Sequence, residues 1–195
     1  MENTFFLKER DMFTKILLRT VFLVLMILLT SSAMYAKEAA SEPIIEGKGV
    51  AGLKIGDTEE SVISVISRGL FKLYKVERGL DLNDKFISFG NAGEDGVLVI
   101  DVLLSKGKIG AILLISESVK GNHLYKGKTT EGFSFGDTFQ KVEQLYGKPV
   151  IEKGIYMYKK EGIAFGTVGP IEGKEPNSII IMSPGSDFNI DAIFQ

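Results

Sequence analysis

The sequence predicts an α+β protein built from two tandem repeats. Each repeat is expected to contain a strand, a helix and three or four further strands, with the helices packed on one face of an antiparallel sheet. Three observations lead to this prediction. A stretch of eleven residues, 52–62, returns eighty residues later as 132–142. Both copies carry a helix-start pattern, and both are followed by apolar or alternating runs between turn residues.

The two copies are identical at five of eleven positions and keep apolar side chains at two more. In each copy an apolar-x-apolar pair leads into Gly-Asp-Thr, and Asp is a favoured N-cap residue. A Glu or Gln three positions after the Asp completes a capping box. We therefore interpret these residues as structural helix caps: Gly56, Asp57, Thr58, Gly136, Asp137 and Thr138.

Apolar runs that follow each predicted helix indicate strands. We expect them over 71–78, 86–89, 97–104 and 109–115 in the first repeat, and over 150–153, 154–158, 163–168 and 178–182 in the second. Runs 97–104 and 109–115 flank a Gly-containing turn and form the most apolar hairpin. Neither run alternates cleanly, so we expect part of the hairpin to be covered on both faces.

Asp101 interrupts the apolar run 97–104, on the same face as Val97, Val99 and Leu103. Two interpretations stay open. It is either a structural carboxylate, hydrogen-bonded in the interior or placed near the sheet rim, or a functional carboxylate.

Residues 1–36 have the pattern of an export signal, with charged residues first, an apolar run over 21–29 and small residues after it. The run is well short of the roughly 20 residues that a membrane span needs. We expect cleavage near residues 33–36, after Ala33 or Ala36, and a periplasmic or secreted protein. An uncleaved membrane anchor is the alternative.

The expected organisation follows from the signal and the two repeats. It comprises a signal peptide (1–36), a flexible lead (37–47), repeat 1 (48–118), a linker (119–130), repeat 2 (131–185) and a C-terminal tail (186–195). Translation starts at Met1 or Met12. The tail contains four large apolar residues, and because free apolar tails promote aggregation, we expect it to dock on the domain.

Composition excludes several classes of protein. The 195 residues include no cysteine, which rules out a disulfide scaffold, a thiol enzyme and a lipoprotein anchored through Cys. Loss of residues 1–36 leaves 19 Lys/Arg against 22 Asp/Glu. This near balance gives no electrostatic basis for binding nucleic acid or an anionic membrane. We predict no nucleic-acid partner, and membrane contact only through an uncleaved signal.

No catalytic, cofactor-binding or metal-binding residue is predicted. The single histidine, His123, lies among lysines, and the chain has no Gly-x-Ser-x-Gly turn for a Ser-His-Asp triad. One His without Cys leaves only carboxylates for zinc, the acidic residues of 81–84 do not fit a calcium loop, and Gly-Asp-Thr lacks the rest of a phosphate loop. Two carboxylates that meet across a cleft stay possible.

Tyr156 and Tyr158 share one face of the predicted strand 154–158. Exposed tyrosines on a rigid sheet commonly anchor protein partners, so these two are our candidate partner-binding residues. The alternative is that they pack beneath the helix or the tail, with their hydroxyl groups reaching solvent.

The second repeat carries apolar-x-apolar-Gly-Asp-Thr, a short helix, Gly-x-Pro and then a tyrosine-bearing strand, over 132–149 and at Tyr156. This pattern resembles the beta-lactamase-inhibitor-protein and outer-membrane assembly lipoprotein (SmpA/OmlA-like) group of exported modules, over about 40 of 195 residues. The first repeat has Arg68-Gly69 where Gly-x-Pro falls, and the lipidated Cys of the assembly lipoproteins is absent. The resemblance implies helices on one face of an antiparallel sheet and a non-enzymatic binding surface.

The function that we expect is therefore an exported, non-enzymatic module that binds a protein or a cell-envelope component through a sheet face. The alternative is a small periplasmic ligand-binding protein, or a hydrolase that uses a carboxylate cluster the sequence does not identify.

Overall fold

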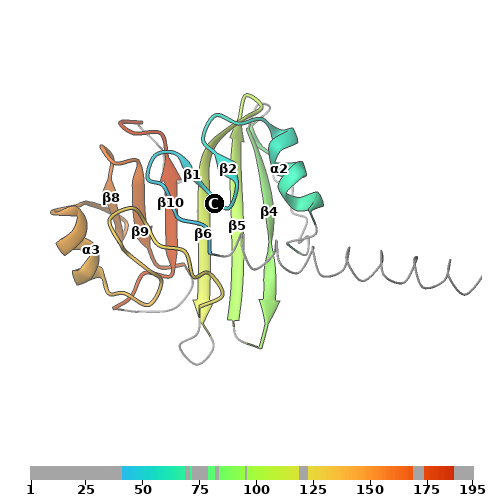
Figure 1. Cartoon of the computed structure of the whole chain (residues 1–195). Coiled ribbons are helices and arrows are strands. Elements are labelled where there is room, and N and C mark those ends of the chain that lie inside the picture. Colours follow the sequence, from blue (N-terminus) through green and yellow to red (C-terminus); the bar gives the residue numbers. More distant parts are fainter. Residues whose placement is uncertain are drawn as a thin grey trace, which may run out of the picture.

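The computed structural model of the chain describes residues 41–68, 71, 79–81, 84–94, 96–118, 123–168 and 174–186. Over these residues the protein is mainly β, as Figure 1 shows. Eight strands form one antiparallel sheet, and two very short strands form a second sheet. The expected signal peptide and most of the expected strand 71–78 lie outside the described residues.

The main sheet has the strand order β3-β4-β5-β6-β10-β9-β8-β7. Neighbours in the chain pair within each group of four strands, and β6 pairs with β10 in the middle, where Leu113 lies opposite Ile180. The strands are β3 (Gly79–Asp81), β4 (Asp84–Gly93), β5 (Gly96–Ser105), β6 (Lys108–Ser118), β7 (Val150–Glu152), β8 (Ile155–Tyr158), β9 (Ile163–Gly166) and β10 (Ser178–Met182).

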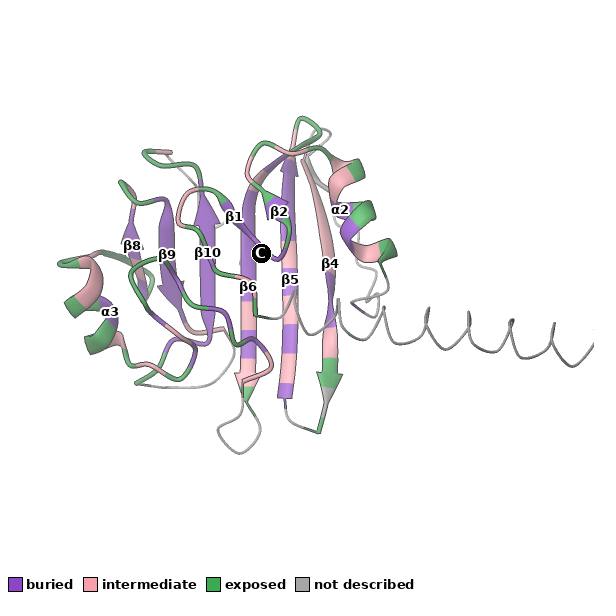
Figure 2. Cartoon of the chain, in the orientation of Figure 1, coloured by how far each residue is buried: buried purple, intermediate pink, exposed green. Residues whose placement is uncertain are grey.

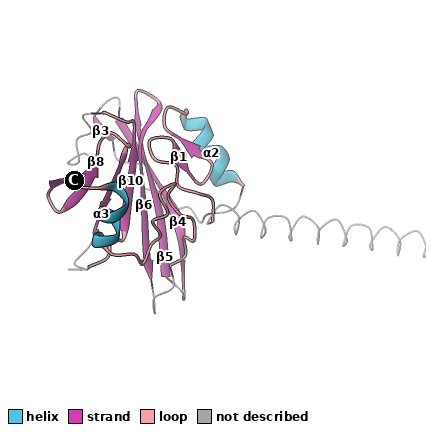
Figure 3. Cartoon of the chain, turned by 60° about the vertical axis from the view of Figure 1, so that its left-hand side comes forward, coloured by secondary structure: helices cyan, strands magenta, loops and turns pink. Residues whose placement is uncertain are grey.

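One face of the main sheet, here called the helix face, is covered by α2 (Glu59–Ser67), α3 (Phe139–Tyr146) and the small sheet of β1 (Gly49–Val50) and β2 (Leu53–Lys54). In Figure 3, α2 lies to the right of the strands and α3 lies in front of them. Side chains from both helices and the small sheet join one apolar core with alternate residues of the strands. The alternation of buried and half-buried residues along β5 is visible in Figure 2.

The predicted α+β class with two strand–helix–strand repeats is wrong. The two helices of the described residues have only nine and eight residues. Strand β2 has two residues and pairs only with β1, outside the main sheet. The expected strand around Phe133, just before α3, is a loop. The Phe133 N–H donates to Thr129 Oγ1 at 3.0 Å, and its carbonyl accepts from Thr129 N at 2.9 Å.

The apolar-x-apolar pattern of Phe133 and Phe135 has a different origin from the expected strand. Both rings are buried in the core on the helix face, and the Phe133 ring lies 4.8 Å from that of Phe165. Two buried side chains at this spacing therefore do not require a paired backbone.

Within Gly-Asp-Thr the three residues have separate roles. The N-cap residues are Thr58 and Thr138, and the Thr138 hydroxyl accepts from Lys141 N at 3.2 Å. Asp137 instead accepts from Ser134 N at 2.8 Å, which closes the turn before the helix. Gly136 has a φ of 96°, a conformation that favours glycine.

Residues 41–47 differ from the flexible lead expected over 37–47. Ile44 is fully buried, and its N–H donates to the Lys128 carbonyl at 2.8 Å. The Tyr125 hydroxyl donates to the Glu42 carbonyl at 2.6 Å. These contacts fix the start of the described chain on the helix face.

Replacing Gly136 with alanine should lower the free energy of unfolding by about 1–2 kcal/mol, because an L side chain is strained at this positive φ. The new methyl group itself meets nothing closer than 3.6 Å. Urea denaturation measures the change. Gly110→Ala is the matched control: the closest contact of its methyl group is 3.8 Å, so a change within about 0.5 kcal/mol is expected. Equal losses in both variants would contradict the conformational explanation.

Candidate functional site

The candidate partner-binding tyrosines lie on the helix face, beneath α3. Tyr158 is 4% exposed, and its hydroxyl donates to the Gly147 carbonyl at 3.1 Å. Burial raises the pKa of this phenol to about 12. The half-buried Tyr156 packs its ring 4.5 Å from that of Phe139. Both residues therefore help to hold α3 on the sheet, and Tyr158 leaves almost no surface for a partner.

His123 contacts a serine in a geometry that does not support catalysis. Its Nδ1 lies 3.0 Å from the Ser116 carbonyl oxygen and 3.3 Å from the Ser116 hydroxyl. A nitrogen that faces a carbonyl oxygen has to donate its proton, so it does not accept the serine proton as a general base. Ser116 is also fully buried. The pair, with His123 stacked on Phe135, joins the linker to the sheet.

The carboxylate of Glu46 already has hydrogen-bond partners within the chain. The Tyr146 hydroxyl donates to its Oε1 at 2.5 Å, and Glu131 N donates to the same oxygen at 3.4 Å. Burial alone raises the pKa of Glu46, but hydrogen bonds from Thr130 and Tyr146 outweigh burial and lower it. The group is therefore held as a carboxylate that ties the first described residues to α3.

The face of the sheet opposite the helix face, here called the opposite face, presents a different surface. Its side chains at the β4 and β5 end are half-buried and mostly apolar, and they include Phe86, Val97 and Val99. Cross-strand pairs place Asp101 between Ser88 and Leu113 in the middle of this surface.

Ser88, Asp101 and Leu113 lie opposite one another on three neighbouring strands, and Asp101 is the only charged residue of the three. Its carboxylate is incompletely hydrogen-bonded. Its Oδ1 is inaccessible to solvent and has no hydrogen-bond partner among the described residues. Burial raises the pKa of the Asp101 carboxyl, and a hydrogen bond with the Ser88 side chain offsets part of the effect. A buried acceptor without a partner costs roughly 1–3 kcal/mol of stability.

The sequence left open whether Asp101 is structural or functional. A structural carboxylate would be expected to satisfy both oxygens, as buried polar atoms generally do. Because Asp101 costs stability where an apolar residue would fit the pattern, it is a candidate for binding. Its neighbours Phe86 and Ser88 carry no sequence signal of their own. Only the register of β4 against β5 brings them to Asp101.

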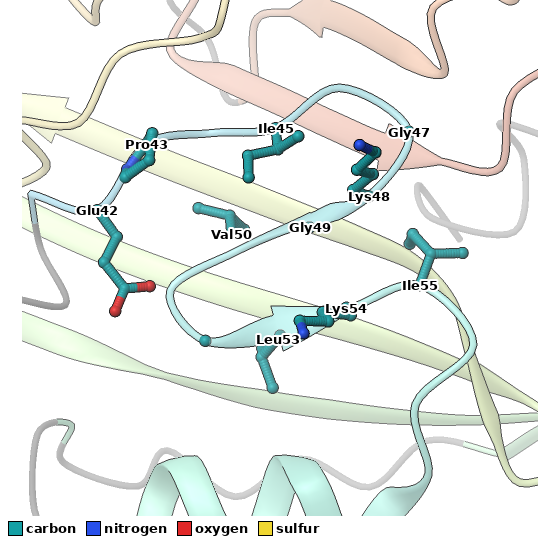
Figure 4. A pocket seen from close by; sticks show the side chains of 11 residues that line it. Glu42, Pro43, Ile45, Gly47, Lys48, Gly49, Val50, Leu53, Lys54 and Ile55 are labelled. Atoms are coloured by element: carbon teal, nitrogen blue, oxygen red, sulfur yellow. The ribbon is translucent and has the colours of Figure 1, made fainter.

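A second candidate site is a hollow of about 500 Å³ formed by the chain from Glu42 to Ile55, on the helix-face side. Figure 4 shows Ile45 and Val50 between the two limbs of this segment. The lining is mainly apolar, with Lys48 and Lys54 among its charged residues. Glu42 is the only carboxylate in the lining, so the hollow and the raised-pKa carboxylate of Asp101 are separate sites.

Neither site assembles the ligands of a metal. The described residues contain no group of three or more His, Asp or Glu side chains placed to hold an ion. In the same part of the chain, neither helix has the length and apolar character needed to cross a membrane.

The Asp101→Asn variant should gain stability over the natural protein as pH rises above about 4, the ordinary pKa of Asp. A carboxyl whose pKa is raised by folding favours the folded state below that value, and this contribution is lost as pH rises through the raised pKa. We expect a gain of about 1 kcal/mol at pH 8, measured by urea denaturation between pH 4 and 8. The exposed Glu175→Gln is the control and should follow the natural protein. A parallel curve for Asp101→Asn would show that burial does not perturb this carboxyl.

Comparison with protein-family models, with curated proteins and with solved structures gives no match to this chain. Its function is therefore inferred from its own residues.

Proposed function

We propose that the protein is an exported, non-enzymatic module that binds a protein partner of the cell envelope or of the secreted fraction through the opposite face, at its β4 and β5 end. The observation that carries this proposal is the unpaired Oδ1 of Asp101 amid half-buried apolar side chains. Because this oxygen is inaccessible in the free chain, binding requires the Asp101 side chain to turn outward, where a Lys, Arg or amide donor of the partner completes the hydrogen bonds of the carboxylate. The apolar side chains around it exclude water from the contact.

The surroundings of Asp101 favour binding over hydrolysis. Acid–base hydrolysis needs a second catalytic group close to the first, within a cleft that holds the substrate. The residues facing Asp101 across the strands are Ser88 and Leu113, and the hollow lies elsewhere. The resemblance of residues 132–149 to exported binding modules agrees with this proposal.

A photo-crosslinking side chain at Phe86 should capture the partner in the cells that make the protein. The same side chain at Ile63, which is 53% exposed on α2, is the control and should capture nothing specific. Adding Asp101→Ala to the Phe86 probe should reduce the crosslinked band at least tenfold, because the carboxylate anchors the contact. A band of unchanged intensity, or one found equally with the Ile63 probe, would refute the proposed surface.

We also propose a second candidate function: the hollow binds an anionic amphiphile. A volume of about 500 Å³ suits a small apolar ligand, and the ammonium groups of Lys48 and Lys54 suit a carboxylate or phosphate head.

A dansyl-labelled fatty acid tests the second candidate through its fluorescence on binding. Ile45→Asp places a charge in the apolar lining and should weaken the affinity at least tenfold. The control, Ile63→Asp, changes an exposed residue on α2 and should leave the affinity unchanged. The absence of saturable binding to the natural protein would exclude this candidate.

A further inference from the structure

The opposite face over β4, β5 and β6 carries negative charge in a regular arrangement. These strands lie side by side in Figure 1, and their cross-strand pairs order the side chains of this face into rows. Four successive rows are Phe86–Leu103–Ala111, Ser88–Asp101–Leu113, Gly90–Val99–Ile115 and Ala92–Val97–Glu117. The charged residues of these four rows are both carboxylates, Asp101 and Glu117.

Glu117 is separated from Asp101 by a defined spacing. Leu113, the β6 residue opposite Asp101, precedes Glu117 by four positions. Four residues of a strand cover about 13 Å and adjacent strands lie about 4.8 Å apart, so the two backbone positions are about 14 Å from each other. Between them lies the row with the half-buried Val99 and Ile115. Along the strands the surface is therefore acidic, then apolar, then acidic again.

The ends of these strands differ in charge. Beside Glu117, the turn between β4 and β5 adds the exposed Glu94. The turn between β5 and β6, at the far end, carries the exposed Lys106 and Lys108, and the row of Lys108 also contains Asp84. Glu117 forms no ion pair with another described residue. The negative charge without a matching cation therefore lies from Asp101 toward the turn between β4 and β5.

We propose that the partner contacts this surface with an extended cationic segment, in which two Lys or Arg residues are four positions apart and an apolar side chain lies midway between them. The inference rests on the proposed function, because it names the chemistry of the partner that binds there. Alternate side chains of an extended segment point to the same side, so residues i, i+2 and i+4 face the sheet together over about 13 Å. The two cations then meet Glu117 and the outward-turned Asp101, and the apolar side chain meets Val99 and Ile115.

The spacing of the carboxylates favours an extended segment over a helix. Residues on one face of a helix recur after seven or eleven positions, which correspond to about 10 Å and about 16 Å. Neither distance matches the separation of about 14 Å as well as an extended i, i+4 pair does. An acidic segment would bring like charges together, and a neutral apolar one would remove water from both carboxylates without replacing their hydrogen bonds.

The Phe86 photo-crosslinking probe in the full chain tests the inference when it is combined with Glu117→Lys. This change reverses the charge at one end of the acidic pair and should lower the yield of crosslinked partner at least tenfold, as measured by immunoblotting. Glu117→Gln removes the charge and should lower the yield several-fold. Glu60→Lys makes the same charge change at an exposed position of α2 and should leave the yield unchanged.

Capture at Phe86 that is unchanged by Glu117→Lys would overturn the cationic segment and leave the proposed binding surface standing. A lack of specific capture at Phe86 would overturn both. The two failures are therefore distinguishable.

A synthetic peptide tests the same chemistry with purified full-length protein. The probe is a fluorescent nine-residue peptide with lysine at its third and seventh positions, valine at the fifth and threonine elsewhere, and fluorescence anisotropy measures its binding. Glu117→Lys should weaken the affinity at least fivefold. A peptide with glutamate in place of both lysines should not bind, and one with its lysines only two positions apart should bind several-fold more weakly. Equal affinities for the three peptides would overturn the inference.

Discussion

The β6–β10 pairing is the contact on which the rest of the molecule depends. It joins two four-stranded groups into one sheet, and the five residues of β10 are all buried. Ile179 and Ile181 face the core on the helix face, while Ile180 and Met182 face the other side. A sheet that is apolar on both faces at its centre has to be covered on both faces. The two faces of the sheet are covered in different ways.

On the helix face the cover is assembled from short pieces instead of long helices. Val62 of α2 and Val142 of α3 are fully buried, and the loop rings of Phe133 and Tyr125 are buried in the same core. Because many of these residues are in loops, their backbone groups are satisfied by local bonds such as the Thr129–Phe133 pair. Ile44, from the first described residues, is buried in the same core. The layer on the helix face is therefore built from chain segments that are far apart in the sequence.

On the opposite face some apolar side chains are covered and others are only half-buried. The function that we propose depends on this difference. Side chains over β8 to β10 are buried, whereas those around Asp101 are half-buried and surround an unpaired carboxylate oxygen. A surface of this kind costs the isolated chain stability, and a partner with a matching donor recovers it. The pKa of the Asp101 carboxyl is raised for the same reason, because burial disfavours its charged form.

Local chemistry in the sequence was enough to predict the hairpin of β5 and β6, the strands β8 to β10 and a helix after each Gly-Asp-Thr, although the N-cap residues are Thr58 and Thr138 and not the expected Asp57 and Asp137. Turn residues, capping groups and runs of apolar side chains act over a few positions, so they can be recognised without knowing the fold. Tertiary structure alone decided that Phe133 lies in a loop, that Tyr158 faces α3 and that Asp101 meets Ser88. Alternation indicates that a side chain is buried but not which layer buries it, because the partner strand and the covering layer come from distant parts of the chain.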